Sequence, residues 1–254
     1  MHYFEEHLLP GERNIIPYLP TTVQFLDYIS EHYGDSIALS DRNQAVSYSE
    51  LALHVACRRH VLEELHLPPR CNVGLLDTNS IAAVEWFLAL TTAGLTAVML
   101  PSTLSEAVLI RTAQHYELKA IIAGPAVIEK TDALCIPIIP VYFMERRGDS
   151  PAFVAKNDRA AIFFTGGTTG TPKGVMLNHG AIMRGALNGT YRDGTMFGQT
   201  LVAALPFTHV FGMVFSMLSG LYTGSHMAVC GNMRDLFKEM ASAKPTTMIA
   251  VPGM

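Results

Sequence analysis

The stretch Thr165-Gly166-Gly167-Thr168-Thr169-Gly170-Thr171-Pro172-Lys173-Gly174 lies between two apolar segments that are typical of strands. Glycine permits positive φ angles, so successive backbone N–H groups can turn toward one ligand and form a concavity that favours negative charge. The threonine hydroxyls add donors, and Lys173 adds a mobile cation suited to phosphate. The composition therefore predicts a phosphate-binding loop.

Two other interpretations of this loop are weaker. The P-loop of nucleoside triphosphatases requires G-x-x-x-x-G-K-[ST], with the lysine opening a helix and a hydroxyl residue after it. Here Pro172 precedes Lys173, Gly174 follows it, and residues 174–177 are typical of a strand. Proline also pushes Thr171 away from helical geometry. A merely flexible Gly/Thr hairpin loop rarely carries this density of glycine and hydroxyl groups.

Residues 162–175 resemble the signature loop of the adenylate-forming superfamily: acyl- and aryl-CoA synthetases, peptide-synthetase adenylation domains and firefly luciferase. The family pattern, roughly [ST]-[SG]-G-[ST]-T-G-x-P-K-G-[VA], is satisfied at every position, with Gly166 where many members carry serine. The resemblance implies a site for the phosphates of ATP, formed by Thr165, Gly166, Gly167, Thr168, Thr169, Gly170, Thr171, Pro172 and Lys173.

Three further segments resemble the family in the right order. Residues 46–51 resemble "[LV]-[ST]-Y-x-E-L", and residues 93–101 resemble "A-G-x-x-x-V-P-L", with Met99 where proline is usual. Residues 205–212 resemble "L-P-[LF]-x-H-x-x-G", which lines the acyl site in acid–CoA ligases. This match implies a carboxylic acid site at His209, Val210, Phe211 and Gly212. The alternative for His209 is an ordinary core or turn histidine.

The resemblance implies a two-step reaction that uses ATP, Mg2+ and coenzyme A. A carboxylate attacks the α-phosphorus of ATP, pyrophosphate leaves, and the acyl group then passes to a thiol. The Gly/Thr loop would stabilise the charge on the phosphates rather than form a covalent intermediate. Because the family is much longer and its ribose, hinge and catalytic lysine segments are not found here, we expect an N-terminal part that is inactive alone. The alternative is a non-catalytic phosphate-binding or structural fragment.

The acid is expected to lack an α-amino group. Peptide-synthetase adenylation domains carry an aspartate in an "F-D" pair near this position, whereas Thr208 and His209 follow Phe207 here. An adenylation domain that delivers to a carrier protein stays open as an alternative to CoA transfer. An aliphatic or aromatic tail is suggested by the apolar residues Phe211, Met213, Val214, Phe215 and Met217. Methionine is equally good core filler, so the length of the acid stays open.

Composition and charge exclude several other classes. A net charge of −4 gives no electrostatic footprint for nucleic acid. The four cysteines, at 57, 71, 135 and 230, lack C-x-x-C spacing, and the ten histidines do not cluster, so no metal ligand is assigned. The N-terminus lacks the features of a secretory signal. The apolar stretches 83–100 and 202–222 fit a buried helix and strand better than a membrane span. We therefore expect a cytoplasmic protein without a transmembrane segment.

The alternation of strand and helix signals predicts the fold class: α/β, with a mostly parallel sheet. The later expected elements include strand 136–142, helix 210–222, helix 233–242 and strand 246–251. The resemblance refines the pattern into two mostly parallel α/β lobes, the second incomplete. Residues 1–71 would hold helices and a hairpin that pack on the second lobe, residues 72–195 the first lobe with the phosphate loop, and residues 196–254 the start of the second. An unfinished sheet edge favours a homo-oligomer.

Overall fold

The fold is described from a computed structural model, in residues 16–144, 150–165, 173–190 and 198–251. It contains two sheets, and all their strand pairs are parallel except β1–β2 and β7–β8. This confirms the predicted class of two mostly parallel α/β sheets. The boundaries predicted at residues 71 and 195 stay a prediction.

The first sheet has six strands in the order β6-β5-β3-β4-β7-β8. Their bounds are β3 Asn72–Asp77, β4 Thr96–Pro101, β5 Ala120–Ala123, β6 Ile138–Pro140, β7 Arg159–Thr165 and β8 Lys173–Asn178. The predicted strand 136–142 is observed over three residues, and Pro137 just before it has no N–H to give to the sheet.

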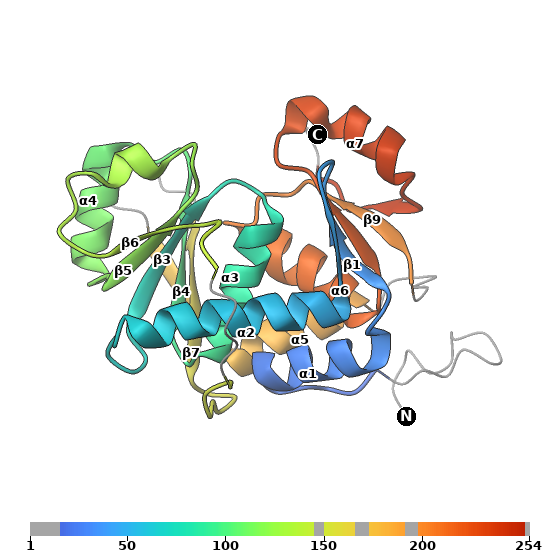
Figure 1. The fold of residues 1–254 in the computed structure, drawn as a ribbon, viewed down its shortest axis with the longest axis horizontal. Coiled ribbons are helices and arrows are strands. Elements are labelled where there is room, and N and C mark those ends of the chain that lie inside the picture. Colours follow the sequence, from blue (N-terminus) through green and yellow to red (C-terminus); the bar gives the residue numbers. More distant parts are fainter. Residues whose placement is uncertain (1–15, 145–149, 166–172, 191–197, 252–254) are drawn as a thin grey trace.

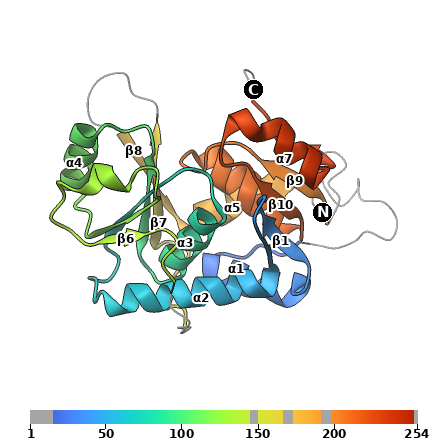
Figure 2. The same cartoon turned by 45° about the horizontal axis from the view of Figure 1, so that its top comes forward.

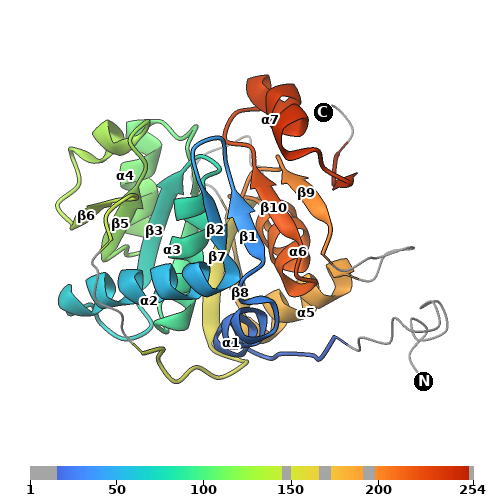
Figure 3. The same ribbon diagram turned by 45° about the vertical axis from the view of Figure 1, so that its right-hand side comes forward.

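The second sheet has five strands in the order β11-β9-β10-β1-β2. The labels β9, β10, β1 and β2 mark neighbouring strands of this sheet in Figure 3. Their bounds are β1 Ile37–Ser40, β2 Ala45–Ser47, β9 Thr200–Ala203, β10 His226–Val229 and β11 Thr247–Met248. The predicted strand 246–251 pairs over two residues only, opposite Leu201 and Val202, because β9 itself ends at Ala203.

The helices form a central layer between the sheets and an outer layer on each side (Figures 1 and 2). The central elements are α1 Thr22–Tyr33, α2 Tyr48–Glu64, α3 Ile81–Thr92, α5 His179–Thr190, the π-helix η2 Phe211–Leu218 and α6 Ser219–Tyr222. The outer elements are α4 Glu106–His115, with the short η1 Ile128–Thr131, and α7 Leu236–Ala243, with the short η3 Met233–Asp235. The predicted helices 210–222 and 233–242 are both observed as continuous runs, each of which changes its hydrogen-bond pattern: η2 is followed directly by α6, and η3 by α7.

The period-2 alternation of the strands explains why helices cover both faces of each sheet. Leu75, Met99 and Phe163 belong to the central core, which also takes Ala203 and Val229 from the second sheet. Their strand neighbours Leu76, Leu100 and Phe164 belong to the outer cluster beside α4, and Val202 and Ala228 to the cluster beside α7. Neighbouring strand residues thus serve two different apolar layers.

The N-terminal hairpin and α2 connect the second sheet to the helix that covers the first. β1 pairs with β10, so the hairpin extends the second sheet. The helix α2 contacts β1 and β2 of the same sheet and packs along α3, which lies against β3 and β4 of the first sheet. Its start is fixed by a capping box, in which the Glu50 backbone N–H donates to the Ser47 hydroxyl and the Ser47 N–H donates to the Glu50 carboxylate.

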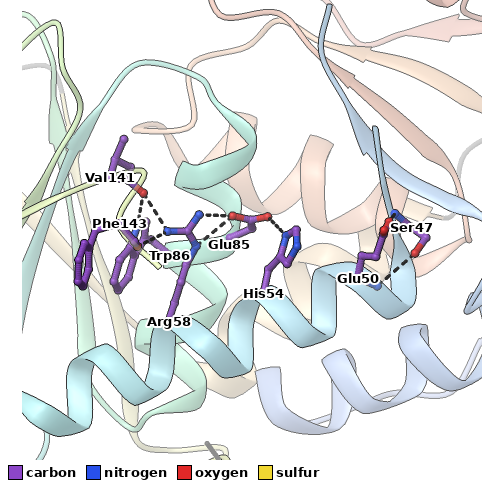
Figure 4. Close-up of polar contacts among 8 residues, drawn as sticks. All are labelled: Ser47, Glu50, His54, Arg58, Glu85, Trp86, Val141 and Phe143. Carbon is purple, nitrogen blue, oxygen red and sulfur yellow. Dashed lines mark hydrogen bonds and ion pairs between the residues drawn. The ribbon is translucent and has the colours of Figure 1, made fainter. Parts of the chain in front are cut away.

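The interface of α2 and α3 contains a buried ion pair (Figure 4). Arg58 of α2 donates to the Glu85 carboxylate of α3 and, at 2.9 and 3.0 Å, to the carbonyls of Val141 and Phe143. His54 contacts the other Glu85 oxygen at 2.7 Å. The side chains of Arg58 and Glu85 are almost completely buried. Each of the two charged groups has partners, as a buried charge requires.

Candidate functional site

The two ends of the predicted phosphate loop lie next to each other. Thr165 ends β7, Lys173 begins β8, and the two residues pair across the antiparallel ladder. The Thr165 hydroxyl donates to the Lys173 carbonyl at 3.3 Å, and both residues are exposed. The rest of the predicted loop lies outside the described residues: Gly166, Gly167, Thr168, Thr169, Gly170, Thr171 and Pro172. The loop therefore starts and ends at one point, the carboxyl end of β7.

A pocket of about 540 Å³ opens beside this point. Its walls come from β7, β8, the turn after β9, the start of η2 and the residue before Pro252, and nearly all of them are apolar. The lining residues are Phe163, Phe164, Thr165, Val175, Leu177, Leu205, Pro206, His209, Val210, Phe211, Gly212 and Val251. Thr165 belongs both to the loop base and to the pocket wall, so the two features are continuous.

All four residues predicted for the acid site, His209 to Gly212, line this pocket. The His209 N–H donates to the Pro206 carbonyl at 3.1 Å, and the His209 carbonyl accepts from the N–H groups of Gly212 and Met213, both at 3.0 Å. A Cβ at Gly212 would lie 2.2 Å from the Pro206 oxygen, so only glycine permits this close turn. The turn is compact and presents His209 at the pocket wall.

The helix after His209 contributes less to the pocket than predicted. Phe211 lines the pocket and stacks on Phe215 with ring centroids 4.9 Å apart. Met213, Val214 and Met217, however, are buried in the central core and do not line the pocket. The core-filling alternative for Met213 and Met217 fits these positions, because η2 packs against α5 and the core here. A tail site beside this segment stays a prediction.

A second, smaller pocket of about 160 Å³ lies on the other side of Pro206. It is lined by Asp77, Thr78, Asn79, Ser102, Ala204, Pro206, Thr208, Cys230, Gly231 and Met233. Burial raises the pKa of Asp77, although the Ser80 hydroxyl donates to its carboxylate at 2.6 Å. Sequence reasoning missed Asp77 and Asn79; the available signal was their position directly after a parallel strand, where ligand sites gather.

Other features of the described ranges point to no metal site. Within residues 16–144, 150–165, 173–190 and 198–251, no group of three His, Cys, Asp or Glu side chains could hold a metal ion. The four cysteines are free; Cys57 and Cys230 are buried, Cys71 is half-buried and Cys135 is exposed.

In the same described ranges, no helix has the length and apolar character needed to cross a membrane.

The sequence from residue 26 to residue 254 matches the family model described as AMP-binding enzyme. The chain belongs to this family. Among curated relatives, it is 33% identical over 121 residues to long chain acyl-CoA synthetase 8 of Arabidopsis thaliana, covering 43% of this chain and 17% of that protein. It is also 24% identical over 231 residues to the nonribosomal peptide synthetase agiA of Aspergillus flavus, covering 85% of this chain and 3% of that protein.

The fold is also similar to solved structures. The crystal structure of VinN superimposes with a TM-score of 0.81 at 19% identity, covering 93% of this chain and 62% of VinN. At this identity the likeness supports the fold alone. The chain spans less than two thirds of VinN and of both curated relatives. This AMP-binding family member is therefore similar both to an acyl-CoA synthetase and to a peptide synthetase.

Proposed function

We propose that this chain is the N-terminal part of an AMP-forming ligase that joins a carboxylic acid without an α-amino group to the thiol of coenzyme A. The observation that carries the proposal is the apolar pocket with His209 in its wall, continuous at Thr165 with the base of the Gly/Thr loop. An acid held in such a pocket would have its carboxylate beside the phosphates of ATP held by the loop. The reaction is expected to take place in the cytoplasm.

The first step of the proposed reaction makes an acyl-adenylate. A carboxylate oxygen bonds to the α-phosphorus of ATP, the bond from that phosphorus to the oxygen that bridges it to the β-phosphorus breaks, and pyrophosphate leaves. Lys173 fits the role of a charge stabiliser for the leaving phosphates, because it is exposed at the loop base. Mg2+ would be held mainly by the phosphates and water, as is usual for this ion.

The second step passes the acyl group to a thiol. The sulfur of coenzyme A attacks the acyl carbon, AMP leaves, and the thiol proton is released. Within the described residues, His209 is the ionisable side chain in the pocket wall, so it fits the role of orienting the carboxylate and then the adenylate. Apolar walls around it exclude water, which would otherwise hydrolyse the intermediate.

A second candidate function is an adenylation domain that delivers its acid to a carrier protein, which the similarity to a peptide synthetase favours. The pocket argues against an amino acid substrate. Its described lining residues include no aspartate or glutamate, and Thr208 borders the smaller pocket instead. An ammonium group without a carboxylate partner would keep its desolvation cost of several kcal/mol. Even about 2 kcal/mol of that cost gives a roughly thirtyfold preference for the acid without the amino group.

Pyrophosphate exchange by the protein translated from the complete reading frame tests the proposal. We expect exchange with hexanoate and at least roughly thirtyfold less with norleucine, followed by thioester formation with coenzyme A. A preference for norleucine would replace the proposal by a peptide-synthetase function. Absence of exchange with any carboxylic acid would favour a non-catalytic or structural role.

Lys173→Ala in the same protein separates the roles of loop and pocket. The variant should weaken ATP use in adenylation and leave binding of a preformed acyl-adenylate intact, because that intermediate has lost the β- and γ-phosphates. Lys156→Ala is the matched control, since Lys156 is an exposed lysine that lines neither pocket. Equal losses for both ligands would contradict a phosphate-binding role for the loop.

A further inference from the structure

Asn79 links the two sheets at the turn that carries His209. It follows β3 of the first sheet and precedes the Ser80 cap of α3. Its side-chain Nδ2 donates to the Leu205 carbonyl at 2.9 Å, and its Oδ1 accepts from the Phe207 N–H at 2.9 Å. Both partners belong to the turn after β9 of the second sheet.

The chemistry of the carboxamide suits this position. Leu205 and Phe207 are two residues apart, so the carbonyl of one and the N–H of the other face the same side, as at the edge of a strand. The turn has left the sheet, because β9 ends at Ala203, and Pro206 between them has no N–H. A carboxamide gives one donor and one acceptor and so replaces the missing strand neighbour. Neither a carboxylate nor an aliphatic side chain can make both bonds.

Short contacts connect this pair of bonds to His209. The carbonyl of Pro206, which lies between the two bonded residues, accepts the His209 N–H at 3.1 Å. Gly212 packs directly against the same carbonyl. A shift of the turn at Leu205 or Phe207 therefore moves His209 and the start of η2 together.

We propose that Asn79 is a positioning residue that holds His209 at the wall of the large pocket. This inference rests on the proposed function for its effect on ligand binding, and on the contacts above for its effect on His209. Asn79 itself lines only the smaller pocket, so it acts through the turn and not by contact with a ligand in the large pocket.

The same strand offers a matched control. Asn72 begins β3, and its side chain also makes two hydrogen bonds: Nδ2 donates to the Tyr116 carbonyl at 2.6 Å, and Oδ1 accepts from Arg159 at 3.0 Å. It lines neither pocket around Pro206. Asn72→Ala and Asn79→Ala therefore remove the same side chain and the same number of bonds, one at the start of β3 and one just after its end.

The experiment compares these two variants with the unchanged chain by three measurements. Urea unfolding gives stability, and calorimetric titration with decanoyl-sulfamoyladenosine, a stable mimic of an acyl-adenylate, gives affinity. The third is the imidazole Cε1–H NMR signal of His209 in protein labelled with ¹³C-histidine, assigned with His209→Gln. If Asn79→Ala does not fold, Asn79→Asp replaces it, because it keeps the shape and the acceptor but loses the donor to Leu205.

We expect both alanine variants to lose stability, but only Asn79→Ala to shift the His209 signal and to weaken the mimic at least fivefold. A His209 signal in Asn79→Ala that coincides with that of the unchanged chain would overturn the proposal, whatever the affinity. If the unchanged chain does not bind the mimic but Asn79→Ala still shifts the His209 signal, the proposed function is contradicted and the positioning role of Asn79 is supported. A shift of the same size in Asn72→Ala would show a general structural effect and also overturn the proposal.

Discussion

Asn72 begins β3 and Asn79 lies two residues after its carboxyl end, and the surroundings of the two asparagines differ. At the amino end, Asn72 shares Arg159 with Thr96, so polar groups from the starts of three neighbouring strands pair with one another. At the carboxyl end, Asp77 and Asn79 border open space. The amino end of the sheet holds a polar network, whereas the carboxyl end borders a pocket, which is the usual side for binding in parallel sheets.

The difference implies that substitutions of polar residues have two kinds of effect. Where polar groups satisfy each other, a substitution should change the free energy of unfolding and leave ligand affinity unchanged. Around the pockets, the same kind of substitution should change affinity more than stability.

The largest expected effect on stability comes from the buried pair in Figure 4. Arg58→Ala leaves Glu85 buried without its arginine and removes the donor to the carbonyls of Val141 and Phe143. We expect the free energy of unfolding in urea to fall by about 3–5 kcal/mol. Arg70→Ala is the control: this exposed arginine pairs with Asp158, and its loss should cost about 1 kcal/mol or less. If folded Arg58→Ala bound the ligand more weakly than the unchanged chain, effects on stability and effects on affinity would not be separate.

The next largest expected effect is a loss of stability at acid pH that comes from His179. This fully buried residue begins α5, its Nδ1 lies 3.1 Å from the Thr22 hydroxyl, and burial lowers its pKa to about 4. Because the unfolded state takes up the proton first, near pH 6.5, the contribution of neutral His179 is present above that pH and is lost as pH falls toward 4.

Between pH 7.5 and pH 5 this contribution should fall by about 2 kcal/mol. His179→Gln should therefore show a smaller loss of stability over this range than the unchanged chain, measured by urea unfolding at both pH values. Identical pH dependence in the two proteins would mean that His179 takes up its proton without unfolding the core.

The smallest expected effect concerns the polar network at the amino end of the first sheet. Arg159→Met removes hydrogen bonds to Thr96 at 3.1 Å and to Asn72 at 3.0 Å, at an exposed position. Stability should fall by about 1 kcal/mol, and affinity for decanoyl-sulfamoyladenosine should stay within about twofold, a free-energy change below about 0.5 kcal/mol. A tenfold loss of affinity would show that the amino end is coupled to the pocket and is not a separate structural region.

How much of this could be predicted from sequence depends on how local the signal is. Contiguous residues carry three of the signals: the alternation of strands and helices, the Gly/Thr loop and the segment around His209. The fold predicted from them is confirmed. The sequence left open whether Met213 and Met217 face the acid or the core, because that choice depends on the close approach of Gly212 to Pro206 and on the π-helix that follows. Asn79 was missed because its partner Leu205 lies 126 residues away.

The central claim is that the large pocket holds the acyl part of an adenylate, and two neighbouring residues of β8 test it most directly. Val175 lines the pocket and pairs with Phe163, whereas Met176 pairs with Ile162 and lines no part of it. Successive strand residues point to opposite faces, and both side chains are exposed, so each accepts a larger residue at similar cost.

The measurement is a calorimetric titration of Val175→Trp and Met176→Trp with decanoyl-sulfamoyladenosine. Tryptophan at 175 fills the pocket, so we predict that affinity falls about a hundredfold, which corresponds to about 2.7 kcal/mol. Tryptophan at 176 should leave affinity within about threefold, or about 0.7 kcal/mol. Equal affinity in the two variants would contradict the claim and show that the acyl group binds elsewhere.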